Sequence, residues 1–222
     1  MNFKTYKPQT IGSIWYWIIG GVTRLLWRSF NSPWLIIIAI IIAVAIFMTN
    51  RSREKKFKQA IEECKTSLRD ISDIYSLANY STSALNVKDK GLKCMLAQLI
   101  LEKAEKIPIT AFRLNDPVSK GRSCLFVSKM QKIPHKKIQN EITPIWDKAE
   151  TVYVYLFNNA LEWMSDTKHD TKSVQNILNV KINKSGDFVS ILLRGNNGML
   201  YFKGNNAIVL AAILNRIIYL TY

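Results

Sequence analysis

Residues 33–48 read Pro33-Trp-Leu-Ile-Ile-Ile-Ala-Ile-Ile-Ile-Ala-Val-Ala-Ile-Phe-Met48 and are apolar throughout. The uncharged stretch that contains them extends from Ser29 to Asn50. As a helix it would be about 33 Å long, sufficient for a hydrocarbon core of about 30 Å. The sequence therefore predicts one transmembrane helix, at residues 33–50, close to the N-terminus.

The predicted span has suitable residues at both ends. Trp34 fits one headgroup region, while Arg51 and Arg53 can extend their charged ends into the other. A helix buried in a soluble core is disfavoured by the Ile-rich run between charged ends. A cleaved signal peptide is disfavoured because Ala43-Val44-Ala45, the small-x-small pattern, lies inside the apolar run. The side chains expected to span the membrane are Trp34, Ile38, Ile40, Ile42, Ile46 and Met48.

Residues 1–32 form a basic lead without acidic residues. On a helix over residues 11–27, a polar stripe that includes Arg24 lies opposite a wide apolar face, which is typical of a helix lying in the membrane interface. A second short span over residues 11–27, forming a hairpin with the first, is the alternative. The residues predicted at the interface are Trp15, Trp17, Arg24, Trp27, Arg28, Arg51 and Arg53.

Residues 51–80 are predicted to form a charged helix with a heptad pattern. Its apolar side chains recur at alternating spacings of four and three residues, as on one face of a coiled coil. A self-association stalk and a helix packed against its own domain both fit this pattern, and either can continue the preceding helix as one rod. The predicted face consists of Phe57, Ile61, Cys64, Leu68, Ile71, Tyr75 and Ala78.

Residues 81–222 are predicted to form an α+β domain. An amphipathic helix includes Leu92 to Ile100 and ends before Pro108. A further helix is expected to begin at Thr143-Pro144, with a capping hydroxyl and a proline in its first turn, and to continue to Trp163.

Strands are expected at residues 122–133, 180–184, 187–194 and 199–203, and the last three are joined by the turns Lys184-Ser-Gly186 and Gly195-Asn-Asn-Gly198. A C-terminal helix over residues 207–220 follows. The predicted fold class is therefore α+β, with a single N-terminal transmembrane helix followed by a mixed domain of long helices, a small antiparallel sheet and a C-terminal helix.

No catalytic, cofactor or metal motif is recognisable in the sequence, so an enzyme is not expected. His169 and its acidic neighbours are better explained as a solvated loop than as metal ligands. Cys64, Cys94 and Cys124 match no metal spacing and are interpreted as buried free thiols. The net charge of +15 suits anionic lipid or nucleic acid without choosing between them, and a well-charged soluble surface is the alternative. Because of the predicted anchor, the lipid bilayer is the expected partner and nucleic acid is not.

The layout as a whole resembles the T-even-type bacteriophage holins: a basic lead, one anchor, a charged helix, an α+β domain and a final helix after a hairpin. The features that carry the resemblance are the anchor running into Asn50-Arg51, then Phe57-Lys58-Gln59, Gly198-Met-Leu-Tyr-Phe202, Asn205-Asn206 and Ala211-Ala212-Ile-Leu-Asn-Arg216-Ile217.

The resemblance implies a homo-oligomer in the cytoplasmic membrane that permeabilises it for host lysis, with a periplasmic domain regulated by an antiholin-type protein. The basic residues after the anchor, by contrast, favour a cytoplasmic position for the C-terminal domain. Two other functions fit the same layout. One is a single-span structural subunit of a secretion, pilus or conjugation platform, and the other is a membrane-tethered cytoplasmic binding module.

Overall fold

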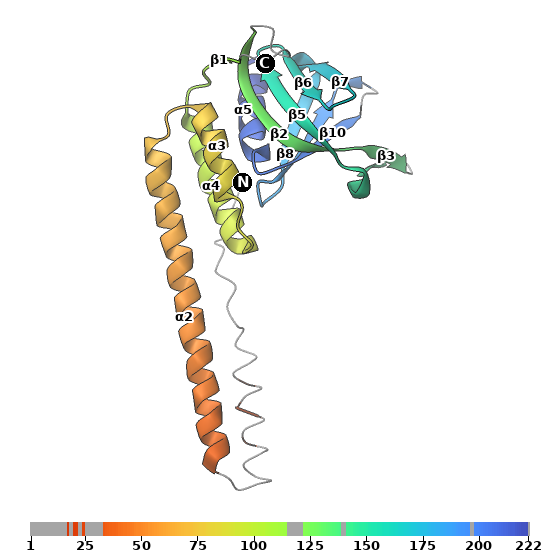
Figure 1. The fold of residues 1–222 in the computed structure, drawn as a ribbon. Coiled ribbons are helices and arrows are strands. Elements are labelled where there is room, and N and C mark those ends of the chain that lie inside the picture. Colours follow the sequence, from red (N-terminus) through yellow and green to blue (C-terminus); the bar gives the residue numbers. More distant parts are fainter. Residues whose placement is uncertain are drawn as a thin grey trace. The chain divides into compact units, whose positions relative to one another are not determined.

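The computed structural model describes residues 17, 20, 21, 24, 33–114, 122–138, 141–195 and 198–221. The chain divides into two compact units, Met1–Glu63 and Cys64–Tyr222 (Figure 1). Helix α2 (Pro33–Asp70) contributes to both, and the helices α3 to α5 and all strands belong to the second unit. Of the predicted interfacial segment, Trp17 and Arg24 are described as helical and exposed, whereas Trp15, Trp27 and Arg28 lie outside the described residues.

Helix α2 continues without a break across the boundary predicted at residue 50. Its 38 residues contain no glycine, and its only proline, Pro33, is the first residue, where the missing N–H costs no hydrogen bond. The second half is stabilised by i,i+4 pairs, among them Lys58 with Glu54 at 3.2 Å. The apolar and the charged segments are therefore one rod, as the sequence allowed.

Among the described residues, no helix is both long and apolar enough to cross a membrane. The prediction of a transmembrane helix at residues 33–50 is therefore wrong, and so is the single-pass inner-membrane location that depended on it. The same finding conflicts with the description of this chain as a single-span holin. The physical reason is length. The apolar run Trp34–Met48 makes about 22 Å of helix, short of the hydrocarbon thickness, and the prediction reached about 33 Å only by counting polar flanking residues.

The second unit contains an eight-stranded antiparallel sheet with the order β7-β6-β5-β2-β10-β9-β8, to which β1 adds by pairing with β2. The prediction of a small sheet is thus also wrong. A separate two-stranded sheet joins β3 and β4. The strands are β1 (Phe112–Arg113), β2 (Ser123–Ile133), β3 (His135–Ile138), β4 (Glu141–Pro144), β5 (Glu150–Phe157), β6 (Ala160–Met164), β7 (His169–Ser173), β8 (Ile177–Ile182), β9 (Phe188–Leu193) and β10 (Met199–Lys203).

The helix predicted from Thr143 to Trp163 is instead a short 3-10 turn, Trp146–Lys148, followed by the hairpin β5–β6. The segment Thr151–Phe157 is made of β-branched and aromatic residues with one leucine, which favour a strand. Val152, Val154 and Leu156 are all buried, as the period of two requires. By contrast, the strands predicted at residues 122–133, 187–194 and 199–203 are confirmed as β2, β9 and β10.

Helices α3 (Ile74–Ala84) and α4 (Lys90–Lys106) are each capped by an aspartate. The Asp73 carboxylate accepts a 2.8 Å hydrogen bond from the Ser76 N–H, and the Asp89 carboxylate a 2.9 Å bond from the Leu92 N–H. Helix α4 confirms the amphipathic helix predicted before Pro108. Because α2 ends at Asp70, the heptad pattern over Phe57–Ala78 is divided between two helices.

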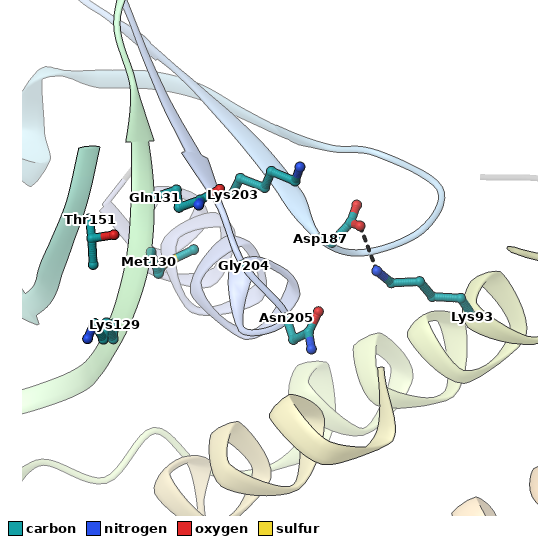
Figure 2. A pocket seen from close by; sticks show the side chains of 9 residues that line it. All are labelled: Lys93, Lys129, Met130, Gln131, Thr151, Asp187, Lys203, Gly204 and Asn205. Atoms are coloured by element: carbon teal, nitrogen blue, oxygen red, sulfur yellow. Dashed lines mark hydrogen bonds and ion pairs between the residues drawn. The ribbon is translucent and has the colours of Figure 1, made fainter. Parts of the chain in front are cut away.

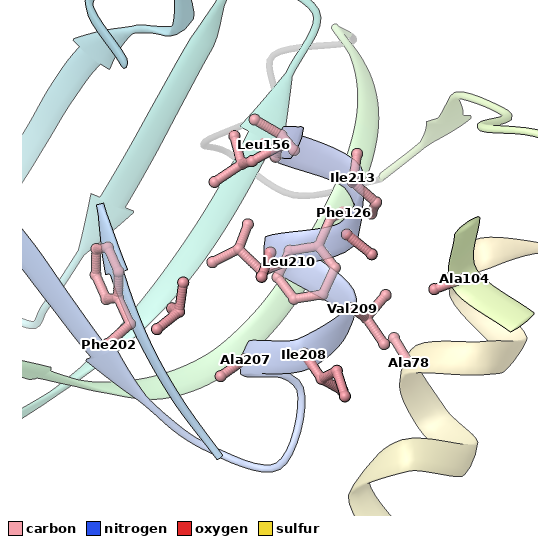
Figure 3. Packing of buried hydrophobic residues seen from close by; sticks show 14 of the residues in the cluster. Ala78, Ala104, Phe126, Leu156, Phe202, Ala207, Ile208, Val209, Leu210 and Ile213 are labelled. Atoms are coloured by element: carbon pink, nitrogen blue, oxygen red, sulfur yellow. The ribbon is translucent and has the colours of Figure 1, made fainter. Parts of the chain in front are cut away.

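Helix α5 (Ala207–Thr221) forms the centre of the second unit, between the sheet and the helices α3 and α4 (Figure 3). Every residue from Ala207 to Leu214 is at most 2% exposed. On one side α5 faces core side chains of the strands such as Phe126, Leu156 and Phe202, and on the other the small residues Ala78 and Ala104. The apolar C-terminal helix is therefore a buried core helix, as predicted.

The turn between β8 and β9 should tolerate no side chain at Gly186. This residue has φ of +72°, and an added Cβ would lie 2.8 Å from Cβ of Ala97. We expect Gly186→Ala to lower the free energy of unfolding by about 2–4 kcal/mol, because the cost of a left-handed backbone at alanine and the cost of the steric clash are added.

Gly195→Ala is the matched control, since Gly195 has φ of +77° but no atom within 4 Å of an added Cβ. This variant should lower the free energy of unfolding by only about 1–2 kcal/mol, because only the cost of the left-handed backbone applies. Chemical denaturation of both variants gives the two values. Equal losses would show that the turn is not packed against α4.

Candidate functional site

A pocket of about 410 Å³ opens in the second unit where β10 separates from β2 (Figure 2). Strand β10 pairs with β2 only from Tyr201 to Lys203, after which the chain turns away towards α5. The turn between β8 and β9 and helix α4 close the other side. The lining residues are Lys93, Lys129, Met130, Gln131, Thr151, Asp187, Lys203, Gly204 and Asn205.

Three of the lining residues form a row across neighbouring strands. Gln131 of β2 is opposite Thr151 of β5 on one side and opposite Lys203 of β10 on the other. Directly paired residues in an antiparallel sheet place their side chains on the same face. A hydroxyl, an amide and an ammonium group are thus presented together along this wall.

The opposite wall is held by an ion pair between α4 and the β8–β9 turn. Lys93 Nζ lies 2.6 Å from Asp187 Oδ2, and Ser185 Oγ and Asn183 Nδ2 donate 2.7 Å hydrogen bonds to Oδ1. Burial alone would raise the pKa of Asp187, but these donors outweigh it and hold the pKa at about 2. Asp187 is therefore a fully paired anion at neutral pH.

Lys129 and Lys203 complete the charge of the pocket. Both side chains are exposed, and among the described residues neither lies within ion-pair distance of a carboxylate. Lys129 Nζ sits 5.9 Å from the centroid of the Tyr153 ring. Since Lys93 and Asp187 neutralise one another, the pocket carries two uncompensated positive charges.

The Asp187 network predicts a pH dependence of stability. The folded-state pKa lies below that of an unfolded aspartate, so the contribution is complete above about pH 4 and is lost as the pH falls towards 2. We expect Asp187→Asn to lower the free energy of unfolding by roughly 1–2 kcal/mol at pH 7, and by much less at pH 2.5. Urea unfolding at both pH values measures this, and an equal loss at both would contradict the assignment.

A second polar cluster lies on the sheet at the start of β2. Arg122 donates two hydrogen bonds to Glu162, at 2.7 and 2.9 Å, and His169 Nε2 lies 3.1 Å from the same carboxylate. The Arg122 guanidinium stacks 3.9 Å above the Phe157 ring. Glu162 is 5% exposed, and the hydrogen bond from Arg122 is the main cause of its lowered pKa.

This cluster has the character of a structural ion pair. Both carboxylate oxygens accept hydrogen bonds from Arg122, and this pairing favours the ionised form of Glu162. His169, predicted to lie in a solvated loop, instead begins β7 and contacts Glu162.

We expect Arg122→Gln to destabilise the fold by about 2–3 kcal/mol, because it leaves the buried Glu162 carboxylate without its bidentate partner. His169→Gln is the comparison, and should cost less because His169 is half exposed and makes one contact. Thermal unfolding, monitored by circular dichroism, shows which of the two variants loses more stability. A larger loss for His169→Gln would assign the main anchoring role to the histidine.

The residues predicted to span the membrane are mostly exposed on α2. Among the side chains of this helix that the structure describes, nine large apolar ones are between 44% and 70% exposed: Trp34, Ile37, Ile38, Ile40, Ile41, Ile42, Val44, Phe47 and Met48. Ile46 is partly buried, while Arg51 and Arg53 are exposed. The exposed apolar side chains belong to one stretch of helix in the first unit, here called the α2 apolar segment (residues 34–48).

The predicted self-association face is used largely inside the chain. Cys64, Leu68 and Ala78 are buried members of the core of the second unit, and Ile71 packs against it. Tyr75 is half exposed, with its ring centroid 5.3 Å from that of Phe112. Phe57 is buried and Ile61 partly so. Of the two alternatives that the sequence left open, the structure favours packing within the chain for residues 64–78.

Within the part of the chain that the structure describes, no group of three or more His, Cys, Asp or Glu side chains could hold a metal ion. Cys64 and Cys124 are buried and Cys94 is partly buried, and all three are free thiols. Burial raises the pKa of Cys64, which disfavours the reactive thiolate. No local pattern in the sequence indicates the pocket itself, because its charged residues come from distant segments.

Comparison with protein-family models and with curated proteins finds no match to this chain. The resemblance to T-even-type holins, and the antiholin-type partner that it implies, remain untested predictions.

Proposed function

We propose that this chain is a self-assembling structural protein without catalytic activity, and that the α2 apolar segment joins its copies. The observation that carries the proposal is the exposure of nine large apolar side chains on one stretch of helix. An exposed apolar surface of this extent marks an interaction site. The predicted permeabilising activity is untested and is not part of the proposal, which retains only the predicted oligomerisation.

The arrangement of the exposed side chains supports contact with more than one neighbour. At about 100° per residue, the exposed apolar positions of the segment cover an arc of roughly 220°. A helix that packs against a single surface needs an apolar stripe of only about 100°. A bundle of three or more helices fits the wider arc better than a pair does.

The spacing within the segment supports association with identical helices. Ile37, Ile41, Val44 and Met48 recur at intervals of four, three and four residues, which is the spacing of a bundle seam. Ile40 and Phe47, seven residues apart, provide a second line beside it. An interface between copies of one chain requires self-complementary surfaces, and aliphatic side chains at heptad spacing satisfy this requirement.

The proposal predicts that Ile41→Glu breaks the assembly. Ile41 is 62% exposed, so the variant should fold as the wild type does. A carboxylate buried in an apolar helix bundle costs several kcal/mol. We therefore expect the wild-type chain to have a mass of three or more copies by multi-angle light scattering, and the variant to shift to the monomer at the same concentration.

Ser52→Glu is the matched control, because Ser52 is an exposed residue of the same helix outside the apolar segment. It should leave the mass unchanged. A wild-type protein that is monomeric at micromolar concentrations, or an Ile41→Glu variant that keeps its oligomeric mass, would refute self-assembly through this segment.

A further inference from the structure

We propose that the pocket between β2, β10, α4 and the β8–β9 turn binds the phosphoryl group of a small soluble molecule. The proposal rests on residues of the second unit alone and is independent of self-assembly. The pocket offers two uncompensated ammonium groups, from Lys129 and Lys203. It also offers the hydroxyl of Thr151 and the amide of Gln131, neither of which has a hydrogen-bond partner among the described residues.

The electrostatics of the pocket favour an anion over a cation. Among the described residues that line it, Asp187 is the only acidic one, and the 2.6 Å contact with Lys93 neutralises it. Its carboxylate oxygens are further occupied by hydrogen bonds from Ser185 and Asn183. An incoming anion therefore meets Lys129 and Lys203 without an opposing free carboxylate.

The start of α5 adds to the positive potential of the pocket. The lining residues Gly204 and Asn205 lie two and one residues before Asn206, after which this 15-residue helix begins, and the N-terminus of the helix carries partial positive charge. The residue before the helix, Asn206, does not use its side chain as a cap. Its Oδ1 accepts hydrogen bonds from Ser81 and Thr82, and its Nδ2 donates a 2.8 Å bond to Ser128.

The volume and the lining specify the class of ligand. A pocket of about 410 Å³ is larger than a lone phosphate ion needs, and lies in the range of small-molecule sites. Of the lining residues that the structure describes, Met130 alone has an apolar side chain. The site therefore suits a polar molecule that carries one or two phosphoryl groups, and not an apolar ligand with a single charge.

The test is a titration of the full chain with pyrophosphate. Binding is measured by isothermal titration calorimetry and by the changes in the amide chemical shifts of residues 203–205. We expect saturable binding, with pyrophosphate bound more tightly than inorganic phosphate. Malonate, a carboxylate dianion, should bind at least tenfold more weakly. The double substitution Lys129→Gln and Lys203→Gln should weaken pyrophosphate binding by about 30- to 100-fold, because two charge-assisted contacts are lost.

Lys172→Gln is the control, because it also replaces a lysine by glutamine but at a position outside the pocket. Lys172 lies on β7, at the edge of the sheet away from β10. It should leave the affinity unchanged. Because Lys129 and Lys203 are exposed, the variants are expected to retain the wild-type unfolding midpoint, which verifies that they are folded. Absence of pyrophosphate binding at millimolar concentration, equal binding of malonate, or an equal effect of Lys172→Gln would overturn the proposal.

Discussion

The structure of the second unit depends on the burial of α5. Its first eight residues, Ala207 to Leu214, are apolar on every side, so no orientation of this helix leaves a polar face for water. It must be covered on all sides, and the sheet alone covers only one. Helices α3 and α4 supply the other cover, and alanines on both, such as Ala78 and Ala104, allow the close approach that the packing requires (Figure 3).

The pocket is a consequence of the same constraint. To begin α5 at Ala207, the chain must leave the sheet directly after Lys203, and β2 loses its partner strand at that point. The separation is fixed by Asn206, whose side chain links α5 to Ser81 and Thr82 of α3 and to Ser128 of β2. A buried helix thus creates an open, polar recess at its own N-terminus, with lysines on its walls.

Much of the second unit was predictable because its signals are local. Helix α4, strand β2, the hairpins from β8 to β10 and helix α5 each have a clear period or a turn glycine, such as Gly186. The β5–β6 hairpin was not predictable by periodicity, because Val152, Leu156 and Trp163 fit helical spacing as well as strand spacing. The pocket could not be predicted from the sequence, because Lys93, Lys129 and Lys203 come close to one another only in the folded chain. The prediction of a span failed on the length of the apolar run.

The two proposed surfaces differ in the physical forces that act on them. Buried polar side chains of the described residues are mostly hydrogen-bonded within the fold, with Trp163 Nε1 and Ser165 Oγ as exceptions. The two proposed surfaces consist of exposed apolar side chains on α2 and of exposed lysines at the pocket. Burial of each large apolar side chain contributes up to about 1.5–3 kcal/mol, which is substantial against a typical domain stability of about 5–15 kcal/mol. Sulfate salts strengthen such burial, whereas ionic strength screens the attraction between lysines and an anion. Salt therefore acts on assembly and on anion binding in opposite directions, and the two activities can be separated in one protein without any substitution.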